Sequence, residues 1–332
     1  MKKQKVHKQV LLLLSLLVFA AVLLSVNNGY AQIPYGDIMA TLLNPAGSEA
    51  STVLLQIRLP RIILAVLCGM GLALSGCTLQ AVTENYLADP GILGINAGAG
   101  FMVMLFLTFF PSLHIKTMIF QPIFAMIGGL SVTWILYSFS KRNGRIRTPY
   151  LLLGGIGVSA GFSAVMMIMA ADMENSSYQL VARWLAGNIW GSSWYHVKSL
   201  VPYLIILIPL LFTKIDILDI LLLGEEASLA LGLQVERERR MLLIIAVALA
   251  SSCISVSGGI GFIGLVAPHI ARRFAGARHR ALLPASMLLG GLLLLMADTM
   301  GRSMFQPVEI PVGIVISVLA APYFLYLLRR QL

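Results

Sequence analysis

The segment GGIGFIGLVAPHIARR, residues Gly258–Arg273, decides how this chain can fold. It is almost entirely apolar, yet it is rich in glycine, contains a proline and ends in a basic cluster. We predict a broken membrane element, because non-helical backbone is tolerated at bilayer depth only where it is packed in protein or lines a water-filled path. We expect its glycines to be pressed by neighbouring helices and some of them to adopt positive φ. The residues that define the break are Gly258, Gly259, Gly261, Gly264 and Pro268.

The composition of the whole chain is that of a membrane protein. Of its 332 residues, 58% are hydrophobic and only 11% are charged, whereas about 25% is typical of soluble domains. The net charge of +10 does not indicate nucleic-acid binding, because the basic residues form short clusters between apolar runs. The three cysteines all lie in apolar segments without metal-ligand spacing, so we expect no metal site and no redox role for them.

About 20 apolar residues are needed to cross the hydrocarbon layer as a helix, and ten runs in the chain fit a span or a broken span. They predict an all-α polytopic membrane protein with both termini on one side, provided that the broken segment crosses. The expected spans are Gln9–Asn27, Ile62–Ala81, Ile92–Phe110, Met118–Ser140, Tyr150–Ala171, Ser199–Thr213, Met241–Val256, Ile260–Ile270, Ala281–Met300 and Val312–Leu328.

The distribution of basic residues predicts the orientation. With these spans, eighteen of the 24 lysines and arginines fall on the side that holds the termini. Cytoplasmic loops carry such an excess, so the N- and C-termini are expected in the cytoplasm. The first apolar run is longer than the core of a secretory signal peptide, which favours an uncleaved first helix.

A weak internal duplication is visible within what we expect to be a single permease domain, residues 1–332. Residues 58–171 and 237–328 each contain a junction broken by glycine and proline, and the layout points the two copies in opposite directions across the membrane. Paired interrupted segments in an inverted repeat indicate a transport pathway. A cytoplasmic segment, residues 214–240, separates the copies.

Several motifs along the chain together resemble the FecCD permease family, the membrane subunits of ABC importers for ferric siderophores, heme and cobalamin. Tyr86, where proline is usual, and Cys77, where alanine is common, depart from the family pattern. The motifs are RLPR at Arg58–Arg61, SGCTLQAVTENYLADPGILG at Ser75–Gly94, LGEEASLALGL at Leu223–Leu233, the opening segment, DTMGR at Asp298–Arg302 and EIPVGI at Glu309–Ile314.

The resemblance implies a type II importer fold in the cytoplasmic membrane of a bacterium. It also implies four partners besides membrane lipid: an ABC ATPase, a second permease subunit that is identical or related, an extracytoplasmic substrate-binding protein and an iron-chelate cargo. Ferric siderophores are the expected cargo, with heme and cobalamin as alternatives. No cofactor is expected on this chain, which lacks a Gly-Lys dipeptide and therefore a P-loop. ATP is expected to be hydrolysed by the partner, and this chain is not expected to be an enzyme.

Residues Gly224–Gly232 predict a short, slim helix on the cytoplasmic surface. Glu225 and Glu226 lie in its first turn, where carboxylates favour the positive end of the helix dipole. Ala227 keeps the surface slim, and Gly232 suits a left-handed exit. The resemblance implies that this helix couples the permease to its ATPase. A plain surface helix is the alternative.

Three arginines at the opposite side, Arg58, Arg61 and Arg302, run against the charge bias. The resemblance implies that they dock the substrate-binding protein through its carboxylates. Contact with lipid headgroups, or an internal pair with Glu309, is the alternative. We also expect Asp298 to pair with Arg302 at i,i+4 spacing.

Polar residues at the inner end of the second span, Gln80, Asn85 and Asp89, are expected to satisfy backbone groups freed around Pro90 rather than to bind cargo. They belong with the broken elements of the predicted pathway. Three tryptophans, Trp184, Trp190 and Trp194, predict an interfacial belt, with a substrate contact as the alternative.

An ion-coupled secondary transporter is the rival interpretation, since such proteins also use inverted repeats and broken helices. It needs acidic residues near the bilayer midplane, and the sequence places none there convincingly. Dependence of transport on ATP rather than on membrane potential separates the two classes.

Overall fold

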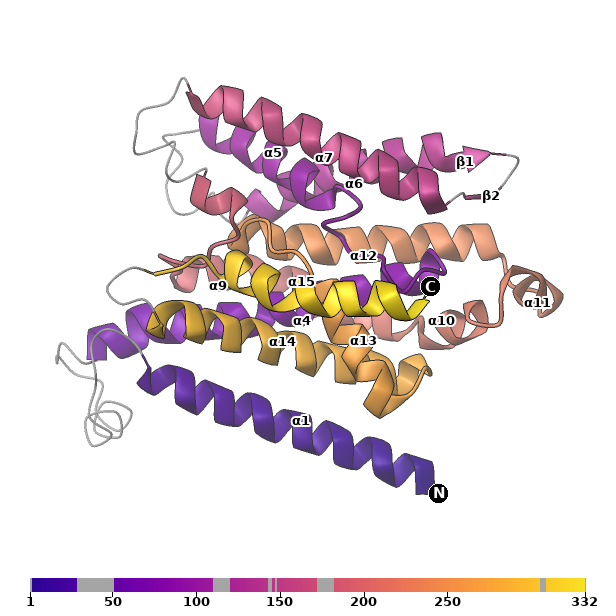
Figure 1. The fold of residues 1–332 in the computed structure, drawn as a ribbon, viewed down its shortest axis with the longest axis horizontal. Helices are drawn as coiled ribbons and strands as arrows, with labels where there is room; N and C mark the ends of the chain where they lie inside the picture. Colours follow the sequence, from indigo (N-terminus) through magenta and orange to yellow (C-terminus); the bar gives the residue numbers. More distant parts are fainter. Residues whose placement is uncertain are drawn as a thin grey trace.

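The computed structural model describes residues 2–28, 51–109, 120–142, 145–146, 148–171, 182–304 and 309–331. Within these ranges the chain is helical except for loops and one small hairpin, in which β1 (Lys141–Arg142) pairs antiparallel with β2 (Arg145–Ile146). The long helices lie roughly side by side, and both termini lie at the end of the bundle from which α11 projects (Figure 1). We refer to this as the α11 end and to the other as the Arg302 end.

The helices follow the order of the predicted spans. They are α1 (Lys2–Asn27), η1 (Thr52–Arg58), α4 (Leu59–Val82), α5 (Ile95–Phe109), α6 (Gln121–Ser140), α7 (Thr148–Ala171), α9 (Trp194–Phe212), α10 (Ile215–Leu221), α11 (Glu225–Ala230), α12 (Val235–Ser257), α13 (Ile263–Ala275), α14 (His279–Ser303) and α15 (Val312–Gln331).

Among the described residues, seven stretches are long and apolar enough to cross a membrane, which indicates a multi-pass membrane protein. They contain or overlap seven of the predicted spans, and the other three predicted spans coincide with α5, α13 and α15. The seven stretches are His7–Asn27, Thr52–Val82, Gln121–Ser140, Leu153–Ala171, Trp194–Phe212, Val235–Ser257 and His279–Ser303. The division into an inverted repeat stays a prediction.

The second span begins earlier than predicted, at Thr52 rather than Ile62. Its first seven residues form the π-helical turn η1, which leads directly into α4 at the Leu59-Pro60 step. Proline has no N–H and its ring crowds the carbonyl four residues earlier, so a widened turn before it lets the helix continue.

Three helices, α4, α12 and α14, form the interior of the bundle. Of the most apolar stretch of each, 78%, 72% and 67% of the residues are buried, against 17% in α1 and α7. Glycines allow α4 and α14 to touch closely: a Cβ on Gly69 would lie 2.7 Å from the carbonyl carbon of Gly290 and 2.9 Å from the Cα of Gly291. Small residues at such contacts permit the close packing that associates helices in lipid.

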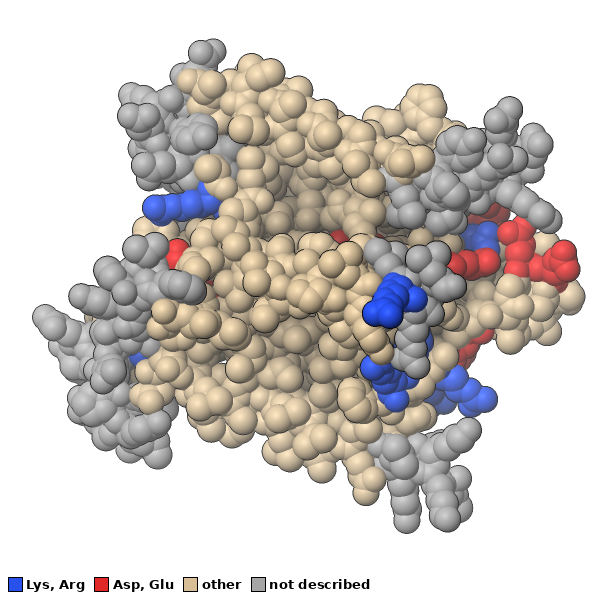
Figure 2. All heavy atoms as spheres, viewed as in Figure 1, with Lys and Arg blue, Asp and Glu red and all other residues tan. Residues whose placement is uncertain are grey.

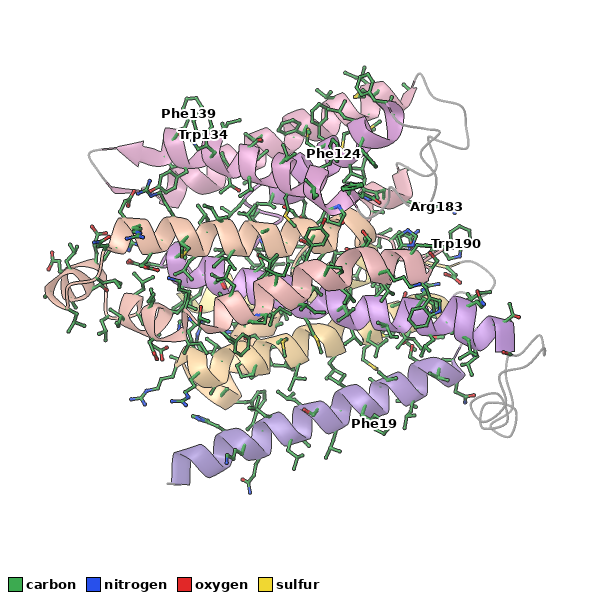
Figure 3. All side chains as sticks on the ribbon, turned by 180° about the vertical axis from the view of Figure 1, so that it is seen from behind. Phe19, Phe124, Trp134, Phe139, Arg183 and Trp190 are labelled. Carbon is green, nitrogen blue, oxygen red and sulfur yellow. The ribbon has the colours of Figure 1, made fainter. Side chains whose placement is uncertain are left out.

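The outer surface of the bundle suits a lipid environment. On the face shown in Figure 2, charged side chains gather toward the two ends and the surface between them is almost uncharged. Phe19 on α1 and Trp134 and Phe139 on α6 are 62%, 71% and 84% exposed, and Figure 3 shows them on the outside of the bundle. Exposed aromatic and aliphatic side chains at this density indicate contact with hydrocarbon.

The predicted break in the opening segment is confirmed. Helix α12 ends at Ser257, residues 258–262 are not helical, and α13 starts at Ile263. Because α12 and α14 run in the same direction (Figure 1), the chain from Gly258 to Ala275 returns across the bundle between them. The 13 residues of α13 rise about 20 Å, so the non-helical residues supply the rest of the crossing.

Candidate functional site

The predicted surface helix is present as α11, and its two flanking glycines have the expected geometry. Gly224 has φ 89° and Gly232 has φ 80°, values that side chains rarely tolerate. The N–H of Gly232 donates to the carbonyl of Leu229 at 2.9 Å, and the N–H of Leu233 donates to that of Ser228 at 3.0 Å. This pair of bonds is a Schellman motif, which ends a helix at a left-handed residue.

Helix α11 is bonded to α10 on its buried side and has apolar residues on its exposed side. The hydroxyl of Ser228 is buried and donates to the carbonyl oxygens of Ile220 at 3.0 Å and Gly224 at 2.8 Å. Leu223, Leu229 and Leu231 are 62%, 55% and 63% exposed. Together with the acidic first turn, visible at the α11 end in Figure 2, these leucines form a small apolar knob with acidic residues beside it.

A charged bridge that the sequence did not reveal connects α11 to the end of α4. The guanidinium of Arg239, on α12, pairs with Glu225 at 3.0 Å and also with Glu84, two residues beyond α4. Glu84 has φ 51°, one of two described non-glycine residues with positive φ. Sequence patterns contain no signal for this bridge, since its members come from three separate segments.

The broken segment begins where Gly258 ends α12 with φ 70°. The N–H of Gly259 donates to the carbonyl of Trp184 at 3.1 Å, and a Cβ on Gly258 would collide with that same carbonyl. The expectation of a packed glycine with positive φ is therefore confirmed at Gly258. Phe262 adopts φ 66° as the residue that precedes α13, which no sequence rule predicts for a bulky side chain.

Gly264 and Gly261 differ in their surroundings. A Cβ on Gly264 would lie 2.9 Å from the Cδ of Pro90 and 3.1 Å from the Cα of Gly76, so α13 rests directly on α4 and its following turn. A Cβ on Gly261 would meet no atom within 4 Å. The expectation that Gly261 is pressed by a neighbouring helix is therefore wrong, because it lies in the open turn before α13 rather than on its packed face.

The polar residues at the end of α4 satisfy backbone groups, but mainly those of α13. The amide of Gln80 donates to the carbonyl oxygens of Gly264 at 3.3 Å and Leu265 at 3.4 Å. Pro268 lies inside α13 and has no N–H, so the carbonyl of Gly264, four residues earlier, lacks its helical donor. The Gly264 carbonyl that Gln80 satisfies is thus freed by Pro268 rather than by Pro90.

The turn after α4 is internally bonded, as expected. The side chain of Asn85 accepts the N–H of Leu87 at 2.9 Å, and that of Asp89 accepts the N–H of Gly91 at 2.8 Å. A role for Asn85 in the pathway stays a prediction.

Arg272 of α13 reaches the same turn. It donates to the side-chain oxygen of Gln80 at 3.3 Å, and its guanidinium lies over the ring of Tyr86, 4.3 Å from the centroid. Tyr86, where proline is usual in the resembled family, is therefore a stacking partner of α13 in this chain. A cavity of about 150 Å³ opens beside these groups, and it is lined by Gln80, Ala81, Glu84, Tyr86, Leu221, Leu222, Gly224 and Arg272.

The three arginines of the Arg302 end form a buried cluster instead of an open docking surface. Arg61 pairs with Asp298 at 2.8 Å and with Glu309 at 2.7 Å, and Arg302 pairs with Asp298 at 3.1 Å. Arg58 donates to the carbonyl of Val26 at 2.7 Å. The exposed fractions of Arg58, Arg61 and Arg302 are 5%, 8% and 7%.

This cluster confirms the expected Asp298–Arg302 pair, and it shows the internal pair with Glu309 that was the alternative to docking. A docking role in which the guanidinium groups stand free for a partner does not fit their burial, because each already has partners inside the protein. Docking of a binding protein at this end stays a prediction.

The three tryptophans do not share one environment. Trp190 is 56% exposed and lies 5.1 Å from the Arg183 guanidinium, and both point outward at the Arg302 end in Figure 3. Trp194 donates its indole N–H to the carbonyl of Leu55 at 2.9 Å. The backbone carbonyl of Trp184 contacts the broken segment, and its ring lies against Gly100 of α5. An interfacial belt fits Trp190, whereas the other two are part of the tertiary packing.

Comparison with known proteins agrees with this geometry. Residues 16–330 match the FecCD transport family. The iron(3+)-hydroxamate import system permease protein FhuG of Bacillus subtilis is 41% identical over 319 residues, which cover 95% of both chains. The hemin transport system permease protein HmuU of Yersinia pestis is 36% identical, with 96% of this chain and 94% of that relative covered.

A solved structure has the same fold. An inward-facing conformation of a metal-chelate type ABC transporter matches with a TM-score of 0.82 and 27% identity, covering 97% of this chain and 99% of the other. The fold similarity and the sequence similarity therefore both extend over nearly the full length of the chain. This chain belongs to the FecCD transport family.

Proposed function

We propose that this chain is the permease subunit of a binding-protein-dependent ABC importer. The observation that carries the proposal is α11, a short helix with an acidic first turn that projects from one end of the bundle, with exposed Leu229 on it and exposed Leu223 and Leu231 beside its ends. Exposing these apolar side chains to water does not stabilise the folded protein. We propose that the knob enters a cleft on an ATPase.

The α11 end is assigned to the cytoplasm of a bacterial cell. Eighteen of the 24 basic residues fall on this side when the predicted spans are used, which is the bias of cytoplasmic loops. Cargo then enters at the Arg302 end from a substrate-binding protein. Two permease subunits, identical or related, enclose the pathway, and one ATPase lies under each.

Ferric siderophores are the proposed cargo. The relatives compared above are an iron(3+)-hydroxamate permease and a hemin permease, and the former is the more similar in sequence. Heme and cobalamin are the competing cargoes within the same class. The iron chelate is the substrate, and no residue of this chain is assigned as a ligand of the metal.

The proposal is tested by uptake into proteoliposomes that contain the full complex. Uptake of a ferric hydroxamate is expected to require ATP inside, together with the binding protein outside, and to persist when the membrane potential is collapsed. A panel of ferric hydroxamate, ferric citrate, heme and cobalamin identifies the cargo. Uptake that follows the proton or sodium gradient without ATP contradicts the proposal and favours the secondary transporter.

A further inference from the structure

Arg239 bonds two carboxylates that belong to different parts of the proposed transport machine. One amino group of its guanidinium contacts Glu225, in the first turn of α11, at 3.0 Å. The other contacts Glu84, in the turn that follows α4. The Arg239 side chain is only 11% exposed, and its third nitrogen, Nε, is buried without a partner among the described residues. The orientation of this side chain therefore depends on these two carboxylates.

The residues around Glu84 also contact α13, the helix of the broken segment. Gln80, one helical turn before Glu84, donates to two carbonyls of α13. Tyr86, two residues after it, stacks on Arg272 of α13. Glu84 itself has φ 51°, a conformation that a residue other than glycine keeps only when the surrounding contacts impose it.

The cavity described above is lined by Leu221, Leu222 and Gly224, which precede α11, and by Glu84 and Tyr86 of this turn. Close packing cannot pass a displacement across such an open space. The ion pairs of Arg239 connect Glu225 and Glu84 directly and join both carboxylates to α12.

We propose that Arg239 is a positioning residue that transmits displacements of α11 to the turn after α4, and through that turn to α13. The inference rests on the proposed function, since it requires that an ATPase moves α11. It assigns to Arg239 the coupling of ATP hydrolysis to the opening of the pathway at the α11 end.

An arginine is suited to this position because its planar guanidinium presents several donors in a fixed arrangement, so two carboxylates can be held at a set spacing. A lysine keeps the charge but offers a single flexible ammonium group. Arg239→Lys is therefore expected to hold one carboxylate at a time. Glu84→Gln is the sharper variant, because it weakens the pathway side of the bridge and leaves the Arg239–Glu225 pair in place.

The experiment uses the full complex in proteoliposomes and measures ferric hydroxamate molecules taken up per ATP hydrolysed. Glu84→Gln and Arg239→Lys are expected to keep ATP hydrolysis close to the wild-type rate and to lower the uptake ratio by about tenfold, within the usual range of coupling between sites. A purely structural role lowers uptake and hydrolysis together and leaves the ratio unchanged.

Glu238→Gln is the matched control. Glu238 lies next to Arg239 on α12 and pairs with Lys214 at 2.9 Å, with side chains 18% and 17% exposed, but the pair does not involve α11 or the turn after α4. This variant is expected to keep the wild-type ratio. A wild-type ratio in Glu84→Gln and Arg239→Lys overturns the proposal, as does failure of Glu84→Gln to assemble with the ATPase. Failure of the proposed function is distinct, because the wild-type complex itself then shows no ATP-dependent uptake.

Discussion

The side-chain amide of Gln80 in α4 donates to the carbonyl oxygen of Gly264 in α13 at 3.3 Å. This bond replaces the one that Pro268 cannot make within α13, since proline has no N–H. Gln80 is 1% exposed, so an unsatisfied Gly264 carbonyl would be left without water. The contact between α4 and α13 therefore includes a side-chain hydrogen bond from Gln80. At Gly76 and Gly264 the two backbones also touch directly.

The first prediction tests this bond. Gln80→Leu is expected to lower the free energy of unfolding by about 1–3 kcal/mol, the usual cost of leaving a buried acceptor unsatisfied. Pro268→Ala supplies the missing N–H within α13, so the double variant is expected to recover part of that loss. The measurement is thermal unfolding of the four proteins of this double-mutant cycle in detergent. Strictly additive effects would show that Gln80 and Pro268 are not connected through Gly264.

The second prediction separates the two glycines of the broken segment. Gly264→Leu is expected to abolish uptake, because even a Cβ there lies within 3.1 Å of three neighbouring atoms, two of them in the Pro90 turn. Gly261→Leu is expected to keep most of it, since a Cβ there meets nothing within 4 Å. Uptake is measured per correctly inserted molecule.

Gly157→Leu on α7, where a Cβ also meets nothing within 4 Å, is the control for the added side chain alone. Equal loss in Gly261→Leu and Gly264→Leu would contradict the packing described here. It would instead mean that Gly261 contacts another subunit or the cargo.

These contrasts show what the sequence could and could not predict. Apolar length predicted the order of the helices, and glycine at the boundaries predicted the exit of α11 at Gly232, because both are properties of local sequence. The packing of Gly264 but not Gly261, and the positive φ of Glu84, depend on tertiary neighbours. The burial of Arg61 was not predicted for the same reason: its partners are more than 200 positions away in the chain.

The third prediction concerns the arginine cluster. Arg61→Ala is expected to destabilise the protein by about 3–5 kcal/mol, since it leaves the buried carboxylate of Asp298 with one cation fewer. Glu309→Gln is expected to cost no more than about 1 kcal/mol, because the Glu309 side chain is 35% exposed and water can replace part of the pair. Thermal unfolding in detergent measures both.

Arg61→Ala also tests docking at the Arg302 end. If the cluster is structural, stimulation of ATP hydrolysis by the binding protein falls only in proportion to the loss of folded Arg61→Ala protein. Loss of stimulation at unchanged stability would show instead that Arg61 reaches the binding protein despite its burial.

The last prediction concerns the exit of α11. Gly232→Val is expected to strain the backbone by about 1–2 kcal/mol, since a β-branched residue is placed at positive φ. No atom lies within 4 Å of a Cβ at Gly232, so the effect comes from backbone conformation and not from a clash. The strain is relieved if the Schellman bonds open, which turns α11 away from its position. The complex is then expected to hydrolyse ATP with little cargo movement.

Gly232→Asn separates strain from the mere presence of a side chain, because asparagine tolerates left-handed backbone, and it is expected to transport far better than Gly232→Val. Equal uptake per ATP in both variants would show that the left-handed exit does not set the position of α11.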